Sequence, residues 1–390
     1  MKKSKVAVIC CNDYQEHNVE QAVRKGLELV GAGDGLFRAG ETILLKPNLL
    51  AASPPDKAVT THPAVFRSAA SALIEMGVKL KYGDSPALGG VEKVAKKCGL
   101  ADIAQELNIG LADFTTPETI HCAAASQNKQ FVIAKGIKEC DGLVSLGKLK
   151  THGLMKITAA VKNQFGCIPG LLKGEFHIKL PRPHDFARML VDLNVALNPR
   201  LFIVDGIVVM EGNGPRGGAP RHLGLLLFST DPVALDSTAC RVLGIDPEHI
   251  LTVTIGREAG LGQSSRDEIE LVGDGVNFLP LQNFKEVEKP PDFAGKAEWL
   301  RQYLLPRPVI TPTKCVSCGI CVHMCPLDPP VVNWAEEPGS GIPVYDYQRC
   351  IRCYCCQELC PEGAIELYTP WLGRTLGCLR PKGKRGSSCG

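Results

Sequence analysis

Short apolar runs alternate with longer amphipathic segments through residues 4–275. Strand-like apolar runs lie at 6–10, 42–45, 78–82, 141–146, 201–204 and 225–228. Helical patterns at 19–30 and 62–76 lie between some of them, and Thr61 and Pro63 are suited to the cap and first turn of the second. Strands that alternate with helices predict an α/β domain with a mostly parallel sheet.

The composition changes after residue 275. Prolines with Lys and Glu between them predict a linker at 276–310, with one short helix at 294–303. A compact cysteine repeat marks a small module at 311–370. Basic residues among glycines and serines at 371–390 predict a disordered tail, and the alternative is a docking tail for an acidic partner. The large α/β domain is therefore expected at 1–275.

The small module contains the spacing C-x2-C-x2-C-x3-C-P twice. The two runs are Cys315, Cys318, Cys321 and Cys325, and Cys350, Cys353, Cys356 and Cys360. Bacterial ferredoxins bind 4Fe-4S clusters with this spacing, and the fourth cysteine of each run ligates the other cluster. The spacing therefore predicts an α+β ferredoxin-like module with two 4Fe-4S clusters. The predicted ligand sets are Cys315, Cys318, Cys321 and Cys360 for one cluster, and Cys350, Cys353, Cys356 and Cys325 for the other.

Two other interpretations of these cysteines carry less weight. A zinc site normally pairs C-x2-C units across longer gaps, which two tandem runs closed by Cys-Pro do not match. Cys355 lies inside the second run, where its use as a ligand would break the two-residue spacing. We interpret Cys355 as a small buried side chain beside the cluster.

The bulk composition limits the class of protein. The chain has 390 residues, 45% of them hydrophobic, so a second and larger folded body must accompany the module. A net charge of +3 gives no indication of a nucleic-acid partner. Ten of the 18 cysteines do not belong to the two spacing patterns and have no paired spacing of their own, which indicates a reducing, anaerobic setting. No apolar run approaches the roughly 18 residues of a membrane span, and a cytoplasmic protein is expected.

Polar residues gather where the predicted strands end. They are Lys46 and Asn48, Asp84 and Ser85, Lys148, Lys150 and His152, and Asp205. Because the carboxyl ends of parallel strands share one edge of a sheet, we expect these side chains to line one crevice.

The densest of these segments runs from Lys148 to Lys162, with four lysines and one histidine in 15 positions. Clustered ammonium groups lower one another's pKa and attract an anion such as a carboxylate or phosphate. A solvated basic loop is the alternative, and His152 by itself is more often a structural residue than a base. A helix is expected at 156–164, with Lys156 and Lys162 on different faces.

A glycine-rich loop at 212–217 matches G-x-G-x-x-G. A dinucleotide-binding loop should open a helix, whereas this loop contains Pro215 and precedes a strand-like run. No Rossmann cofactor is therefore predicted.

Five motifs occur in a characteristic order along the large domain. They are Lys46-Pro47-Asn48, Gly83-Asp84-Ser85-Pro86, Lys148-Leu-Lys150-Thr-His152, Lys162-Asn163-Gln-Phe-Gly166, and Asp205-Gly206 with Glu211-Gly212-Asn213-Gly214-Pro215. Together they resemble the domain of unknown function 362 family, which often carries a C-terminal double-cluster ferredoxin module. The resemblance extends over nearly the whole chain. It implies this architecture and directs attention to the polar edge of the sheet, but it supplies no substrate.

Three functions are compatible with these features. In the first, a ferredoxin-fused oxidoreductase, electrons pass to an anionic substrate or cofactor in the α/β domain. Lys148, Lys150 and His152 would then bind the anion or donate protons, and Asp84 and Asp205 would orient groups or act as acid–base partners.

The second function is a non-catalytic electron carrier or docking subunit of a larger redox complex, with a redox protein as its partner. The third is a metal- or cluster-handling protein that uses surplus thiols such as Cys98 and Cys167 as transfer ligands.

Overall fold

The computed structural model describes residues 3–170, 172–287, 301–335, 337, 339 and 341–372. Within these residues, nine strands form one mixed sheet at the centre of the large domain. In spatial order they are β11 (Ile269–Val272), β1 (Ser4–Cys10), β10 (Ala219–Ser229), β9 (Leu201–Glu211), β7 (Gly142–His152), β2 (Thr42–Pro47), β3 (Lys79–Tyr82) and β4 (Gly110–Leu111), with β8 (Lys156–Thr158) beside β7.

Most neighbouring strands of this sheet run parallel. Strands β9, β7, β2, β3 and β4 form one continuous parallel set, and β1 and β11 form another parallel pair. Only β10, which lies antiparallel between β1 and β9, and β8 depart from this arrangement in the described sheet. The predicted α/β class with a mostly parallel sheet is confirmed.

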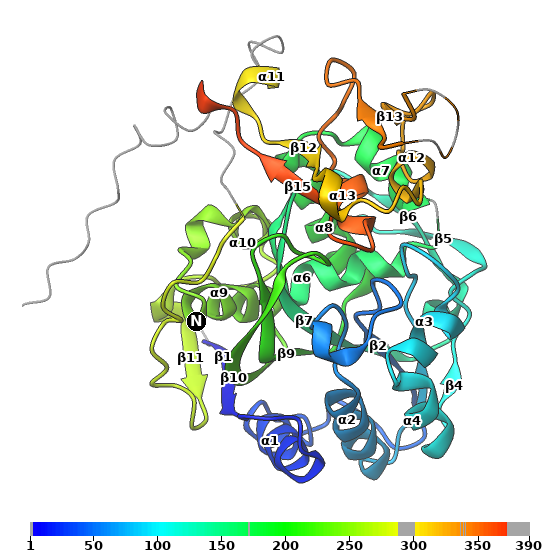
Figure 1. Ribbon diagram of the computed structural model, residues 1–390. Coiled ribbons are helices and arrows are strands. Elements are labelled where there is room, and N and C mark those ends of the chain that lie inside the picture. Colours follow the sequence, from blue (N-terminus) through cyan, green and yellow to red (C-terminus); the bar gives the residue numbers. More distant parts are fainter. Residues whose placement is uncertain are drawn as a thin grey trace, which may run out of the picture.

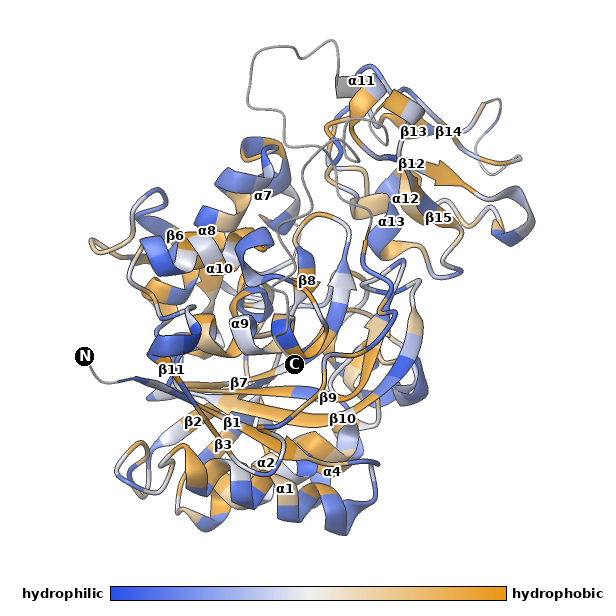
Figure 2. Ribbon diagram, turned by 90° about the vertical axis from the view of Figure 1, so that its left-hand side faces the viewer, coloured by the Kyte–Doolittle hydropathy of each residue, from blue (hydrophilic) through white to orange (hydrophobic). Residues whose placement is uncertain are grey.

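Helices cover both faces of the sheet, so that its apolar strands are enclosed (Figure 2). One face carries α1 (Glu16–Leu29), α2 (Pro63–Glu75), α3 (Val91–Lys97) and α4 (Leu100–Glu106). The other face carries α6 (Ala160–Asn163), α8 (Pro183–Leu197), α9 (Pro232–Val242) and α10 (Leu251–Glu258). Each layer buries its own apolar cluster against the strands, which supplies the main stabilising term.

The remaining elements are short. The large domain also contains a hairpin of β5 (Pro117–His121) and β6 (Gln130–Ala134), the helices α5 (Lys135–Lys138) and α7 (Leu172–Lys179), and the 3-10 turns η1 (Pro55–Lys57), η2 (Gln164–Cys167), η3 (Pro247–His249) and η4 (Arg266–Glu268). None of the helices within the described ranges is long and apolar enough to cross a membrane.

The small module sits above the α/β domain, on the side of α6 and α8 (Figure 1). It contains β12 (Arg307–Ile310) paired with β15 (Ile365–Tyr368), β13 (Val332–Asn333) paired with β14 (Val344–Tyr345), η6 (Pro312–Lys314), α12 (Ile320–His323) and α13 (Cys355–Leu359). The helix α11 (Arg301–Leu304) precedes it. The rest of the helix expected at 294–303 and nearly all of the basic tail lie outside the described residues.

Two strands continue beyond the ends that their apolar runs predict. Strand β7 extends to His152 and β9 extends to Glu211, so that Lys148, Lys150, His152 and Asp205 lie within strands. The predicted boundaries were wrong because a charged residue was taken to end a buried strand, whereas these charges have buried partners. Alternation along β7 directs the side chains of its two lysines and His152 to one face.

The helix expected at 156–164 begins later than predicted. Its first residues form β8, which pairs with the end of β7, and α6 starts only at Ala160. The cap of α2 also differs from the prediction, because His62 Nδ1 accepts from Ala64 N at 3.2 Å. Thr61 instead donates its hydroxyl to Leu146 O at 2.7 Å and so ties this turn to β7.

Gly26 gives a test of how closely α1 packs on the sheet. A Cβ at this position would overlap the ring of Phe228, which is fully buried on β10. We expect Gly26→Ala to lower the free energy of unfolding by about 1–2 kcal/mol, because overpacking costs more than the roughly 1 kcal/mol that alanine adds to helix propensity. Urea unfolding followed by circular dichroism would measure the change. Gly33→Ala, where a Cβ meets nothing within 4 Å, should be neutral or stabilising. An equal response of both variants would refute this packing.

Candidate functional site

The small module docks on the glycine-rich loop that follows β9. Gln357 Nε2 donates to Asn213 Oδ1 at 2.7 Å and to Gly214 O at 3.0 Å, and Asn213 Nδ2 donates to Ile365 O at 2.9 Å. Arg216 adds a bond to Leu359 O at 2.8 Å. The loop therefore holds the cysteine-bearing α13 against the large domain, a role that its sequence motif did not reveal.

A cavity of about 400 Å³ lies between the two parts of the chain. The large domain lines it from the turns after β2 and β3, from α6 and η2, and from α7, and the module lines it from residues around α12 and α13. Its polar lining residues are Asn48, Asp84, Ser85, Thr158, Lys162, Asn163, Lys173, Glu175, His177, His323 and Glu358. The size is typical of a pocket for a small molecule.

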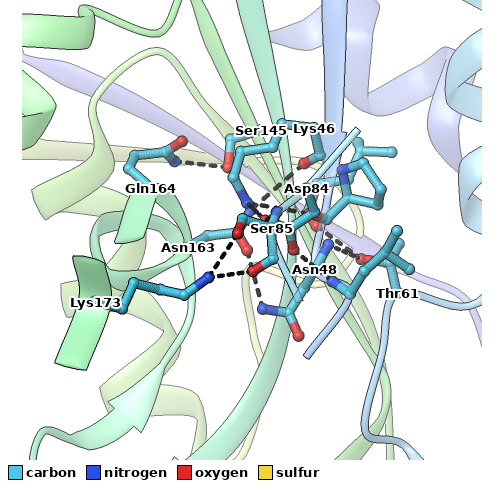
Figure 3. Close-up of polar contacts among 12 residues, drawn as sticks. Lys46, Asn48, Thr61, Asp84, Ser85, Ser145, Asn163, Gln164 and Lys173 are labelled. Carbon is cyan, nitrogen blue, oxygen red and sulfur yellow. Dashed lines mark hydrogen bonds and ion pairs between the residues drawn. The ribbon is translucent and has the colours of Figure 1, made fainter. Parts of the chain in front are cut away.

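Asp84 reaches the cavity as one member of a buried ion pair (Figure 3). Its Oδ1 lies 2.9 Å from Lys46 Nζ, and its Oδ2 accepts from Leu49 N at 2.7 Å. Ser85, the next residue, accepts from Lys173 Nζ through its carbonyl oxygen and, at 2.9 Å, through its hydroxyl. Gly166 leaves the space for this pair, because a Cβ there would overlap the Asp84 carboxylate.

Lys148 and Asp205 form a buried ion pair away from the cavity lining. Lys148 Nζ donates to Asp205 Oδ2 at 2.8 Å and to the hydroxyl of Tyr14 at 2.8 Å, and that hydroxyl donates to Asp205 Oδ1 at 2.8 Å. The ring of Tyr14 stacks on His62 with 3.5 Å between the ring centroids. This closed network links β7 to β9, and neither charged residue lines the cavity.

Lys150 is buried and acts on the cavity only through a neighbour. Its ammonium donates to Asn48 Oδ1 at 2.8 Å and to Val59 O, and Asn48 Nδ2 donates in turn to Asn163 Oδ1 at 3.0 Å. Burial, with the nearby charge of Lys162, lowers the pKa of Lys150 to about 7. Both asparagines line the cavity, so Lys150 orients the amides that a ligand would meet.

His152 forms the contact between β7 and the module. Its Nδ1 accepts from Leu154 N at 3.1 Å and from Met155 N at 3.2 Å, so the neutral ring carries its proton on Nε2. That nitrogen lies 3.3 Å from Glu358 Oε2, a close polar contact whose alignment falls short of a hydrogen bond. Burial lowers the pKa of His152 to about 4. His152 therefore orients α13 as an uncharged ring.

Glu358 lies in α13, next to cysteines of the second run. Burial by itself would raise the pKa of this carboxyl, but His152 and Lys162 hold it below its usual range. The carboxylate is therefore ionised at neutral pH and faces the cavity.

Four cysteines of the module line one small cavity, and they are the predicted set Cys315, Cys318, Cys321 and Cys360. Both cysteine runs also have left-handed backbone at equivalent positions, at Ser317 and Gly319 in the first and at Arg352 and Tyr354 in the second. Left-handed residues of this kind turn successive N–H groups toward one side and create concavities that bind anions, including iron–sulfur clusters. The donor set and the backbone both fit an anionic cluster.

Four further thiols bear on the interpretation of the cysteines. Cys325, the fourth cysteine of the first run, lines the larger cavity together with the buried Cys355. Cys98 and Cys167 are fully buried, and burial raises the pKa of Cys167 to about 12. Buried thiols of this kind are inert, which argues against a role in transferring metal.

The sequence analysis missed the contribution of α7. Lys173 and His177 both line the cavity, and they lie four residues apart on one helix face. This spacing was the signal available in the sequence. The segment carried no strand-end motif, so it was not connected with the polar edge of the sheet.

The fold and site define a protein with an α/β domain and an iron–sulfur electron-transfer module. Residues 43–241 match the model for a domain of unknown function (DUF362), and residues 314–364 match that of a 4Fe-4S dicluster domain. The chain belongs to the DUF362 family. A thylakoid-associated protein of Synechocystis sp. is 33% identical over 291 residues, which cover 74% of this chain and 90% of that protein.

Two solved structures show a distant likeness. The lactate racemase apoprotein of Thermoanaerobacterium thermosaccharolyticum has a TM-score of 0.42 and 13% identity, covering 62% of this chain and 57% of its own. A protein from Thermotoga maritima has a TM-score of 0.36 and 12% identity, covering 58% of each chain.

Because the Lys46–Asp84 pair is buried, we expect the loss of one partner to lower the stability of the protein strongly. Lys46→Met leaves a buried carboxylate without its ammonium, and we expect a loss of about 3–5 kcal/mol in the free energy of unfolding. Chemical unfolding of the reconstituted protein would measure it. Lys25→Met breaks the exposed pair with Asp274 and should cost less than about 1 kcal/mol. If Lys46→Met cost no more than this control, the buried pair would not stabilise the site.

Proposed function

We propose that this protein is a ferredoxin-fused oxidoreductase with two 4Fe-4S clusters, and that it reduces an anionic substrate or cofactor bound between its two domains. One observation carries the proposal, namely that a single cavity is bordered by Cys325 of the module and by Lys162 and Lys173 of the α/β domain. A site for an electron acceptor needs both an electron source within reach and groups that bind the acceptor.

The cysteines would hold the clusters in the two sets that the spacing predicts, Cys315, Cys318, Cys321 and Cys360 for one, and Cys350, Cys353, Cys356 and Cys325 for the other. Such clusters supply one-electron transfer when bound. The first set fits this role because its four thiols surround one small cavity.

The module has an outer and an inner side. Cys318 is exposed, whereas Cys325 lines the cavity. An external redox protein would therefore supply electrons at the outer side, and the acceptor would receive them at the inner side. This polarity favours an enzyme over a simple carrier, which needs no cavity with cationic groups on the inner side of its clusters.

The residues of the α/β domain would take distinct roles around the acceptor. Lys173 would supply positive charge beside Ser85, and Asn48 and Asn163 would present amides held in place by Lys150. Asp84 would orient this group, while its charge is balanced by Lys46. His152 would fix the module, and Lys148 with Asp205 would brace the two strands that carry the site.

Cofactor content gives the first test. Full-length protein that is purified and reconstituted without oxygen should contain about eight iron atoms and eight sulfides per chain. Cys318→Ser should lower both counts to about four, because it removes a ligand of one predicted cluster only. Cys355→Ser, which changes a cysteine outside both ligand sets, should leave them unchanged. A wild-type content of about four iron atoms or fewer, or zinc in their place, would contradict the proposal.

Reaction with small anions separates an enzyme from a carrier. Reduced protein would be mixed with a panel of organic carboxylates and phosphates, and reoxidation followed by the iron–sulfur absorbance. We expect Lys173→Met to slow reoxidation by the active compound at least about tenfold, since it removes a charge-assisted contact. Lys97→Met changes an exposed lysine on α3 and should have no effect. If no compound reoxidises the protein while an added redox protein does so rapidly in both variants, the protein is a carrier.

A further inference from the structure

Lys162 differs from the other lysines around the site, because its ammonium has no hydrogen bond or ion pair with any residue that the structure describes. It lines the cavity, where its Nζ lies 5.9 Å from the centre of the Phe165 ring. The residue is half-buried, and an ammonium group that loses part of its hydration without gaining a partner is unfavourable. An anion in the cavity would supply the negatively charged partner that the chain itself does not provide for Lys162.

His177 is a second polar residue in the lining of the same cavity. Its side chain is 6% exposed, and its Nδ1 has no hydrogen-bond partner among the described residues. The ring stacks on Phe186 with 4.5 Å between centroids and meets the edge of Phe165 at 5.9 Å. Burial lowers the pKa of His177 to about 4, so a neutral ring with one N–H donor is fixed in place.

The backbone that carries Lys162 is held by a buried carboxylate. Asp236 accepts from Ala160 N at 2.6 Å and from Val161 N at 3.1 Å, which fixes the first turn of α6. Its side chain is 1% exposed. Lys162 follows directly, so the position of its Cα is set before any ligand arrives, which reduces the entropy lost on binding.

Two of the acidic groups nearby are already paired with a lysine of the chain. Asp84 accepts from Lys46, Leu49 N and Ser85 N. Glu175, which also lines the cavity, pairs with Lys179 at 2.7 Å. Glu358 lies 3.3 Å from His152 Nε2 without a hydrogen bond, and it acts on Lys162 only through its charge. None of the described carboxylates forms an ion pair with Lys162, so an anionic ligand can take that place.

The rest of the lining is largely apolar. Its apolar members come from both domains and include Leu50, Ala87, Phe165, Ile178, Met324 and Leu359. A ligand that suits this surface has an apolar body and one charged end.

We infer that Lys162 and His177 form the oxyanion-binding end of the cavity, and that its ligand is a small organic molecule with an apolar body and a carboxylate or phosphate group. This inference rests on the proposed function for the identity of the cavity as the acceptor site. Lys162 supplies the charge, and His177 donates its one N–H to the oxyanion.

Calorimetric titration of the reconstituted full-length protein with four probes tests the inference. The probes are benzoate, phenyl phosphate, neutral benzamide, and acetate, which lacks the apolar body. We expect benzoate or phenyl phosphate to bind at least about tenfold more tightly than benzamide and acetate, because a charge-assisted bond and apolar burial both contribute. The anion that binds more tightly shows whether the site prefers a carboxylate or a phosphate group.

Variants assign this binding to the two residues. Lys162→Met should weaken the better anion at least about tenfold, and Lys162→Arg should retain most of the affinity. His177→Phe keeps an aromatic ring in the stack and should weaken binding several-fold. Lys97→Met is the matched control and should bind as the wild type does. Iron content and circular dichroism would confirm that each variant is folded.

Two results would overturn the inference. One is binding of neither anion above the level of benzamide, and the other is unchanged anion affinity in both Lys162→Met and His177→Phe. Failure of the proposed function looks different, since the anions would bind through Lys162 but no anionic compound would reoxidise the reduced protein.

Discussion

An ammonium group inside a folded domain needs partners that replace the water it has lost, because an isolated buried charge is strongly unfavourable. This constraint governs the carboxyl edge of the central sheet. Lys46, Lys148 and Lys150 are each at most 1% exposed there. Each has a specific partner, Asp84 for the first, Asp205 for the second and Asn48 for the third. The strands can continue as buried strands only because these partners come from neighbouring strands and turns.

The same requirement explains why distant motifs in the sequence belong together. Asp84 follows β3, Asp205 lies in β9 and Asn48 follows β2, while two of the lysines lie on β7 between them. A parallel sheet brings these positions to one edge, and charge compensation then fixes the side chains. The cavity begins where that network ends, at Asn48, Asn163 and Ser85. The module closes it from the other side through α13, which Gln357 and Glu358 tie to the large domain.

The sequence predicted the α/β class, the parallel sheet and the edge at which polar residues gather, because these follow from local periodicity and from a general property of parallel strands. It did not predict which of those residues face the cavity. Lys148 and Asp205 have the same appearance in the sequence as Asp84, yet the first two close on each other beside Tyr14. Which partner a buried charge takes depends on contacts far apart along the chain, such as the 191 positions between Tyr14 and Asp205. Periodicity carries no information on such contacts.

Lys173 and Lys162 differ in whether the chain supplies a partner for the ammonium group. Lys173 still has Ser85, through both the carbonyl and the hydroxyl oxygen, whereas Lys162 faces the cavity with only an aromatic ring and more distant carboxylates around it. Lys46, Lys148, Lys150 and Lys173 all have partners from the chain at this edge, and Asp236 fixes the backbone of α6. The absence of a partner for Lys162 is therefore an exception among these lysines. An unpaired ammonium beside a fixed imidazole is what a binding site requires, because any partner supplied by the chain would compete with the ligand. The unpaired charge of Lys162 thus identifies the part of the cavity that would select for an anionic ligand.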